Sequence, residues 1–559
     1  MRLNGAVSFD TVPDDRRTSA LLARLRDDLG AAGFTVAALE ALWGPDAAAA
    51  LHRGERVPAR RVLDARRAAH GASADLATLA ELFVLGLPAP ASEAAHALPA
   101  LGVGGAFELG LLGPIDTPTT PSTPSGTGAA GDHATDGAAP QDDGTAASVR
   151  ARLDLRPYAF TDARGDGHWW ILSDLGEVAL GHALGEQHVL GVGGASLTLA
   201  GLMVPTPART VLDLGTGCGI QAMHASRFAE RIVATDISER ALRLARLNVE
   251  LNGIDGVEFR LGSLFEPVAG ERFDRIVSNP PFVITPRTSG VPEYEYRDGG
   301  MVGDAIVEAV MRGASEHLEP GGIAQLLGNW EVRDDEDGLE RVRRWAGPVD
   351  HWIVEREVQR ITEYAETWIR DGGTRPGTPE FDRLYDAWLD DFERRGVREI
   401  GFGYVLLRRP TDGDGPGRTV GLARAERLHG ALGAHDGGLG AHLADCLGAH
   451  DRQAGLDDEA LAATRLAVAG DVTEERHYWP GDDDPTVMLL RQGGGFGRAV
   501  PLDTGLAALV GASDGELSVG AIVAALAELL EVDAAALAAD LLPAVRALVD
   551  DGMLRLPVE

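Results

Sequence analysis

The chain has 559 residues, which is too long for one hydrophobic core and predicts about three domains of roughly 100 to 200 residues each. Its 85 Asp and Glu residues against 51 Lys and Arg give a formal net charge of -34, which disfavours phosphate backbones unless a basic patch is set apart. No lysine occurs, which excludes a Walker A lysine, a pyridoxal Schiff base and a lysine nucleophile.

Cysteine use and hydropathy indicate the compartment. Cys218 and Cys446 are too few for a disulfide framework or a four-cysteine zinc site. The first residues are acidic and contain no apolar h-region, and the longest nearly apolar run, 189–205, is too short for a membrane span. We therefore expect a cytoplasmic protein without membrane partners.

Residues 1–112 predict a small, mostly helical accessory domain. Apolar residues recur at helical spacing over 21–29 and 36–42, and further helices are expected at 47–51, 59–70 and 75–85. The Gly-rich segment 101–112 is expected to form a hairpin, which would make the domain winged-helix-like.

Six arginines form the basic concentration of this region: Arg53, Arg56, Arg60, Arg61, Arg66 and Arg67. They suit a face that docks RNA or an acidic partner, or a solvated helix face paired with Glu55 and Asp64, which is the commoner use of such runs.

Three further segments complete the predicted domain division. Residues 113–148 are rich in Pro, Thr, Gly and Asp and nearly devoid of large apolar side chains, so they predict a disordered linker. Residues 149–410 are expected to form the catalytic domain and 411–559 a C-terminal accessory domain of winged-helix-like α+β type. In the latter, Ser518 and Asp533 have the character of N-caps before the helices 519–530 and 534–549.

A hairpin is predicted near the start of the catalytic domain, with strands 158–162 and 168–173 around a turn at 164–167. Alternation along the second strand would turn one of Trp169 and Trp170 inward and the other outward. The outward indole would either line a substrate groove or serve packing.

The stretch TVLDLGTGCGI, residues 210–220, carries the main ligand-binding signal. Its apolar start has the character of a buried strand, and three glycines then form a tight turn that lets the backbone approach a nucleotide-like ligand. The next strand, 231–235, ends at Asp236, where a carboxylate can accept ribose hydroxyls. A dinucleotide fingerprint fits less well, because its third glycine would have to stand at Ile220 instead of Gly219.

Later strands are predicted at 257–264, 272–278, 321–328, 352–357 and 403–408, with helices at 305–318 and 378–394. The fourth strand ends on Asn279-Pro280-Pro281-Phe282. Asp298 and Asp304, just past this motif, are expected to be solvated, with substrate guidance as the alternative.

The segments VLDLGTGCG, VATDIS and DRIVSNPPF, in this order and spacing, resemble motifs of class I S-adenosylmethionine-dependent methyltransferases. The last is similar to the Asn-Pro-Pro-aromatic signature of the branch that methylates planar nitrogens. That branch includes release-factor glutamine methyltransferases and small-domain methyltransferases of ribosomal and transfer RNA. The resemblance covers only the central domain and implies a Rossmann-like, doubly wound, seven-stranded α/β sheet with S-adenosyl-L-methionine as cofactor.

The resemblance also implies the site residues. It assigns cofactor contacts to Asp213, Gly215, Thr216, Gly217, Gly219, Asp236, Ile237, Ser263, Leu264 and Asn279. Ser263 stands where the family often has an acid against the adenine amino group, and its hydroxyl can still accept that bond. For the acceptor, the side-chain oxygen of Asn279 and the carbonyl of Pro280 would take the two N–H groups of an NH2. Pro281 would stiffen the loop and Phe282 would stack on the planar group.

The resulting hypothesis is an S-adenosylmethionine-dependent N-methyltransferase acting on a planar amide or amine nitrogen. A protein glutamine is slightly favoured, with a translation factor among the candidate partners, because acidity penalises RNA. The alternatives are a ribosomal or transfer RNA base, at guanine N2 or adenine N6, and a non-catalytic regulatory protein that binds the cofactor. No metal is expected, because His442, Cys446 and His450 suit a packing helix better than a three-ligand face.

Overall fold

A computed structural model of the chain describes residues 15–70, 74–115, 148–180, 184–185, 187–292, 295–411, 421–434 and 437–557. It contains two compact units. The first comprises Met1–Ala159, His168–His182 and Glu250–Gly253, and the second comprises Phe160–Gly167, Ala183–Val249 and Ile254–Glu559. Most of the predicted linker lies outside the described residues, so the division into four segments stays a prediction.

The first unit is mainly helical. Its helices are α1 (Asp15–Ala31), α2 (Val36–His52), α3 (Val57–His70), α4 (Asp75–Leu79), the π-helical turn η1 (Ala80–Val84), α5 (Ala91–Ala97), α6 (Gly102–Glu108) and α7 (Glu177–Leu180). The helix α2 joins the two predicted helices across a kink at Gly44, whose φ is 78°. Leu22, Leu25 and Leu29 are buried at helical spacing on α1, as the periodicity predicts.

The hairpin expected at 101–112 is wrong. Residues 102–108 form α6, because Ala106 on this short helix is buried and packing outweighs its glycines. Strand β2 (Leu112–Pro114) follows and pairs with β3 (Ser148–Ala151), which also pairs with β1 (Ala89–Pro90). The small sheet therefore takes its middle strand from residues after the 116–147 segment.

The predicted hairpin after β3 is confirmed as β4 (Asp154–Asp162) and β5 (Gly165–Ser173). Trp169 and Trp170 are only 8% and 9% exposed, so of the two uses expected for the outward indole the structure shows packing. Trp170 donates its indole N–H to the carbonyl of Phe34 at 2.7 Å, and Trp169 stacks on Tyr158 with ring centroids 6.2 Å apart. Both faces of β5 are thus covered, and neither indole is left for a groove.

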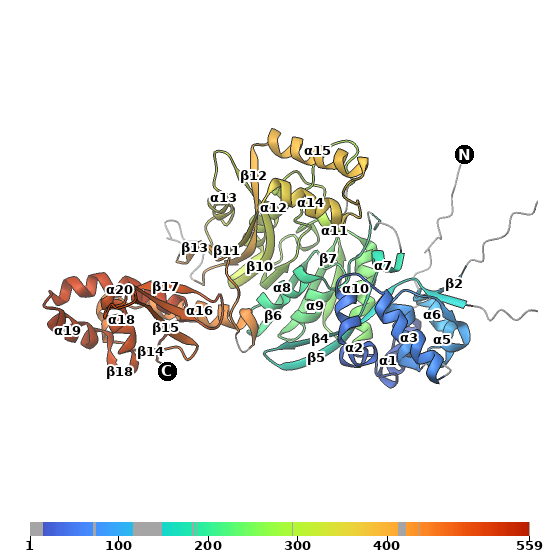
Figure 1. The fold of residues 1–559 in the computed structure, drawn as a ribbon, viewed down its shortest axis with the longest axis horizontal. Coiled ribbons are helices and arrows are strands. Elements are labelled where there is room, and N and C mark those ends of the chain that lie inside the picture. Colours follow the sequence, from blue (N-terminus) through green and yellow to red (C-terminus); the bar gives the residue numbers. More distant parts are fainter. Residues whose placement is uncertain are drawn as a thin grey trace, which may run out of the picture. The chain divides into compact units, whose positions relative to one another are not determined.

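The second unit is organised around an eight-stranded sheet (Figure 1). Its strands are β6 (Ala208–Leu214), β7 (Ala229–Asp236), β8 (Val257–Leu261), β9 (Phe273–Ser278), β10 (Leu318–Arg333), β11 (Asp350–Arg360), β12 (Val397–Arg408) and β13 (Ala423–Arg427). The order is β13-β11-β12-β10-β9-β6-β7-β8, and β12 alone runs antiparallel to its neighbours. The doubly wound class is confirmed, and β13 extends the seven expected strands.

Chain order reverses between β6 and β9, so the topological switch point lies there. Leu214 is the register partner of both Thr235 on β7 and Ser278 on β9. The carboxyl ends of these three strands therefore meet at one edge of the sheet.

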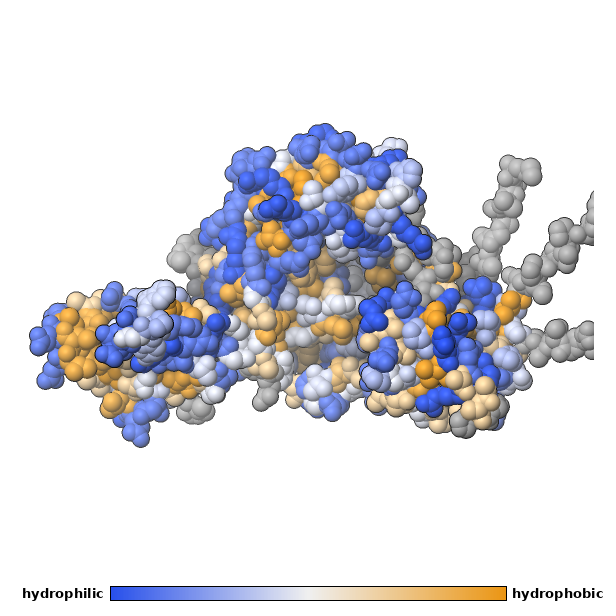
Figure 2. Space-filling model, in the orientation of Figure 1, coloured by the Kyte–Doolittle hydropathy of each residue, from blue (hydrophilic) through white to orange (hydrophobic). Residues whose placement is uncertain are grey.

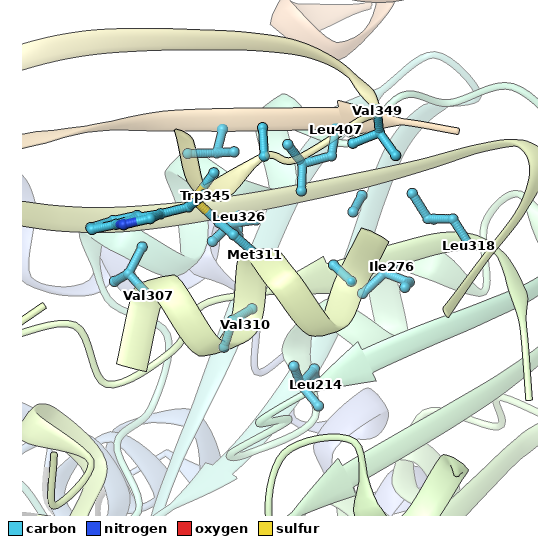
Figure 3. Close-up of a cluster of buried hydrophobic side chains, with 14 of the residues drawn as sticks. Leu214, Ile276, Val307, Val310, Met311, Leu318, Leu326, Trp345, Val349 and Leu407 are labelled. Carbon is cyan, nitrogen blue, oxygen red and sulfur yellow. The ribbon is translucent and has the colours of Figure 1, made fainter. Parts of the chain in front are cut away.

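Helices cover both faces of the sheet, which is why β6 reads as a continuous apolar run. They are α8 (Gly194–Leu202), α9 (Ile220–Ala225), α10 (Glu239–Leu251), α12 (Ala305–His317) and α13 (Gly338–Trp345), with the 3-10 turn η2 at Glu266–Val268. On one face Leu214 and Ile276 pack with Met311 of α12 and Trp345 of α13 (Figure 3). On the other face Val211 packs with α9 in a separate cluster.

A helical hairpin connects β11 to β12 at the carboxyl edge of the sheet. It consists of α14 (Ile361–Asp371) and α15 (Pro379–Arg394), near the short helix α11 (Glu295–Asp298) in Figure 1. Thr378 caps α15 by accepting the amide of Phe381 at 3.2 Å, and Pro379 stands at its first position, as predicted.

The C-terminal part of this unit is a smaller α+β module. Its strands are β14 (Arg465–Val468), β15 (Val472–His477), β16 (Val487–Gln492), β17 (Ala499–Leu502), β18 (Asp514–Ser518) and β19 (Leu554–Arg555). Its helices are α16 (Gly438–Ala454), α17 (Asp458–Ala463), α18 (Thr504–Gly511), α19 (Val519–Leu530) and α20 (Ala534–Asp550). Ser518 and Asp533 cap α19 and α20 as predicted.

Two features of the described residues bear on the expected exclusions. No group of His, Cys, Asp and Glu in the described ranges has a metal-holding arrangement, and His442 and Cys446 are buried on α16. None of the helices within those ranges combines the length and apolarity that crossing a membrane requires.

Candidate active site

The glycine turn after β6 uses backbone conformations that favour glycine. Gly215, Gly217 and Gly219 have φ values of 76°, 55° and 89°. A Cβ at Gly219 would lie 3.0 Å from the Cβ of Ala245, so this glycine lets α10 pack closely. A Cβ at Gly215 or Gly217 would meet no atom of the described residues within 4 Å. The first two glycines therefore leave space beside the backbone that a ligand can enter.

Asp213 is the next-to-last residue of β6 and is fully buried. Its Oδ2 accepts the hydroxyl of Thr216 at 2.5 Å and the amide of Ala222 at 2.9 Å. Its Oδ1 is buried without a hydrogen-bond partner among the described residues. Burial raises the pKa of Asp213 to about 7. A buried oxygen without a partner costs about 1–3 kcal/mol, which a ligand donor would remove.

Asp236 ends β7 and holds the glycine turn directly. Its Oδ2 accepts the amide of Gly217 and its Oδ1 the amide of Ser238, both at 2.9 Å. Burial raises the pKa of Asp236 above its ordinary value. Each carboxylate oxygen retains a second lone pair, so the ribose role predicted for this residue is compatible with its structural one. The neighbouring Ile237 is 60% exposed, which suits a residue that covers a ligand.

The third strand end, after β8, reaches the same edge of the sheet. Leu264 has a φ of 48°, which is rare for a residue with a side chain, and it packs against the core beside α12. The carbonyl of Ser263 accepts the amide of Glu266, which closes the turn. Ser263 and Leu264 thus follow the end of β8 next to the end of β7, where Gly262 donates its amide to the carbonyl of Asp236 at 3.0 Å, and their contacts with a cofactor stay a prediction.

The Asn-Pro-Pro-Phe motif begins where β9 ends. The hydroxyl of Ser278 donates to the carbonyl of Leu214 at 2.8 Å, which joins the two strand ends. Asn279 follows, and its Oδ1 is buried without a hydrogen-bond partner among the described residues. Pro280 is buried. The predicted meeting of the glycine turn and the motif is therefore present, and one carboxamide oxygen there is free to accept.

Pro281 and Phe282 are half-buried. The Phe282 ring lies 5.7 Å from that of Phe402 and packs against three apolar clusters. Its stacking on an acceptor stays a prediction.

The two acids after the motif are not solvated, so that expectation is wrong. Asp298 and Asp304 are 3% and 2% exposed. Arg287 donates to Asp298 at 2.9 Å, and Arg341 donates to Asp304 at 2.6 Å. Burial raises the pKa of Asp304 to about 6. Both acids are held in buried ion pairs, and the partner of Asp304 lies 37 residues further along the chain, where no local pattern could reveal it.

The chain matches three family models. Residues 191–342 match the methyltransferase small domain, and residues 31–120 and 449–556 each match a domain described as having unknown function. The first match contains both the glycine turn and the Asn-Pro-Pro-Phe motif.

Curated relatives match over the same region. A ribosomal protein uL3 glutamine methyltransferase of Bradyrhizobium diazoefficiens is 36% identical over 157 residues, 26% of this chain and 49% of that protein. A release factor glutamine methyltransferase of Xylella fastidiosa is 37% identical over 131 residues, 22% of this chain and 48% of that protein. The chain thus spans about half the length of these relatives.

A Methanocaldococcus jannaschii protein, assigned by its name to the protein N5-glutamine methyltransferases, is 33% identical over 135 residues. This match covers 24% of the chain and 68% of that protein. Among solved structures, the 16S rRNA N2 G1207 methyltransferase of Thermus thermophilus is 21% identical, with a TM-score of 0.24 over 33% of this chain and 46% of that one.

Proposed function

Because the chain belongs to the class I S-adenosylmethionine-dependent methyltransferases of the Asn-Pro-Pro-aromatic branch, we propose that it methylates the side-chain amide nitrogen of a protein glutamine. The observation that carries the proposal is the juxtaposition at the carboxyl ends of β6 and β9. Leu214 and Ser278 are register partners there, and Asn279 presents an oxygen without a partner among the described residues.

The residues at the end of β6 fit the cofactor S-adenosyl-L-methionine, which supplies a methyl group on a positively charged sulfur. The glycine turn leaves open space at Gly215 and Gly217 for the cofactor's approach to the backbone. Asp213 offers a buried carboxylate oxygen, and Asp236 offers a carboxylate for the ribose hydroxyls. Thr216, Gly219, Ile237, Ser263 and Leu264 complete the proposed lining.

The acceptor chemistry falls to the Asn-Pro-Pro-Phe loop. An amide nitrogen is a weak nucleophile because its lone pair is delocalised into the carbonyl, so the site must orient and polarise it. Asn279 Oδ1 and the Pro280 carbonyl would accept its two N–H bonds, and Phe282 would stack on the planar group. No strong general base is required, since the methylated nitrogen can lose its proton afterwards.

Substrate class rests on charge and on the relatives. The relatives are named for methylating glutamine in ribosomal protein uL3 and in release factors. The formal charge of -34 disfavours RNA. Arginines of the cluster on the first unit are engaged locally: Arg67 pairs with Glu81 and Glu93, Arg56 donates to the carbonyl of Leu85, and Arg53 donates to the carbonyl of Ala49. We therefore favour a protein acceptor, with release factors and uL3 as the first candidates.

The test is methyl transfer from labelled cofactor to release factors, to uL3 and to ribosomal RNA, each with the wild type and Asn279→Ala. We expect label on a protein glutamine and a loss of about 10²–10³ in turnover for the variant. Label in RNA alone would overturn the glutamine assignment. Full turnover in the variant would overturn the role of Asn279.

A further inference from the structure

The helical hairpin α14–α15 packs on the loop that follows the Asn-Pro-Pro-Phe motif. Val283 and Ile284 of this loop share one buried cluster with Tyr364 of α14 and with Trp388 and Phe392 of α15. The surface over α15 is mixed, with many hydrophilic side chains (Figure 2), and the buried apolar residues of α15 belong to this cluster. The hairpin is therefore part of the structure that holds the loop.

One hydroxyl joins three separate segments at this contact. Tyr364 is 3% exposed. Its oxygen accepts the backbone amide of Ile284 at 2.9 Å and the side-chain amide of Asn329, within β10, at 2.7 Å. Burial raises the pKa of Tyr364 above its ordinary value, so the hydroxyl stays protonated. Tyr364 thus ties the loop, the sheet and the hairpin together.

A second anchor acts one residue earlier. Val283 donates its amide to the carbonyl of Arg297 at 2.9 Å, and the guanidinium of Arg297 donates to the carbonyl of Trp368 on α14 at 3.0 Å. Both anchors therefore run from the loop backbone to α14.

Downstream anchors matter because the two prolines of the motif contribute no backbone donor. Pro280 and Pro281 have no N–H, so neither can hold its own backbone by donating a hydrogen bond. Their fixed φ angles transmit the position of the next residues to the Asn279 side chain and the Pro280 carbonyl. We infer that Tyr364 is a positioning residue of the acceptor loop, an inference that rests on the proposed function.

The hairpin offers a matched control. Tyr385 on α15 places its hydroxyl 3.3 Å from the carboxylate of Glu366 on α14, so this bond stays within the hairpin. Tyr385→Phe therefore removes the same atom as Tyr364→Phe without touching the loop.

The experiment compares the full-length wild type, Tyr364→Phe and Tyr385→Phe. For Tyr364→Phe we expect turnover per cofactor-binding site to fall at least tenfold, cofactor Kd to stay within about twofold, and amide exchange to accelerate in peptides covering 283–291. Tyr385→Phe should match the wild type in all three. If Tyr364 only stabilised the fold, Tyr364→Phe would reduce the fraction of molecules that bind cofactor and would leave the turnover per cofactor-binding site unchanged.

Equal rates per site in the two variants would overturn the inference, as would unchanged exchange over 283–291. If Tyr364→Phe does not fold, Asn329→Leu removes one of the two hydroxyl contacts and keeps Tyr364. It should lower the rate per site several-fold, and a wild-type rate would overturn the inference. Should the wild type methylate no protein, the proposed function fails instead, while the exchange comparison still tests the loop anchor.

Discussion

The pKa of Asp213 predicts a pH dependence of cofactor affinity. Burial raises this pKa from 3.8 to about 7, so the carboxyl is mostly protonated below neutrality and mostly ionised above it. If the cofactor requires the ionised form, the apparent affinity falls in proportion to the ionised fraction. Between about pH 8 and about pH 6 that fraction drops roughly tenfold, which corresponds to about 1.4 kcal/mol of binding free energy.

The assay is calorimetric titration of the full-length protein with S-adenosyl-L-methionine at pH 6, 7 and 8, at constant ionic strength. Binding at pH 6 should also release a proton, seen as a dependence of the heat on the buffer. Asp213→Asn should bind weakly and should lack the tenfold fall in affinity between pH 8 and pH 6. His224 does not interfere, because burial lowers its pKa to about 4. A wild-type affinity constant within twofold from pH 6 to 8 would refute the reasoning.

The raised pKa of Asp213 also predicts how the stability of the cofactor-free protein depends on pH. A carboxyl whose pKa is raised on folding contributes stability that is present below about pH 4 and is lost as pH rises through about 7. The gap between 3.8 and about 7 corresponds to about 4 kcal/mol. The melting temperature of Asp213→Asn should therefore rise relative to that of the wild type as the pH rises from about 4 to about 7. The same change of melting temperature with pH in the wild type and in Asp213→Asn would contradict this prediction.

The remaining predictions concern the turn and a helix cap. Gly217→Ala should weaken cofactor binding more than Gly219→Ala, as measured by calorimetry. Gly219→Ala should lower the melting temperature more than Gly217→Ala, because a Cβ at position 219 meets Ala245 and one at position 217 meets no neighbour. Asp236→Ala removes the acceptor of the Gly217 amide and should cost at least tenfold in cofactor affinity, and an unchanged Kd would remove this residue from the site. Thr378→Ala should destabilise α15 by about 1 kcal/mol in urea unfolding without changing cofactor Kd.

The sequence predicted the elements that depend on a few residues close together in the chain. The glycine turn, the strand ends and the cap at Thr378 could be predicted because each depends on a few adjacent residues. The juxtaposition of Leu214 and Ser278 followed from the rule that parallel strands deliver their carboxyl ends to one edge.

Long-range pairing accounts for what the sequence could not show. Tyr364 lies 80 residues from Ile284, so no local pattern marks the bond between them. The burial of Asp304 likewise depends on Arg341. Both tryptophans of β5 are buried because the strand is covered on both faces, and alternation assumes one solvated face.

The strand β13 has a consequence for how the molecule is divided in the laboratory. It pairs with β11 from His351 to Glu355, and Arg427 on it donates to the buried Glu355. Cutting the chain near residue 410, a natural place by family resemblance, would bare the backbone of an apolar edge strand and leave Glu355 without this partner. Such a fragment invites edge-to-edge association, so an expression product has to extend at least through Arg427. Leu443 and Leu447 of α16 pack in one cluster with Trp352 of β11, so a product that also retains α16 keeps that face of the sheet covered.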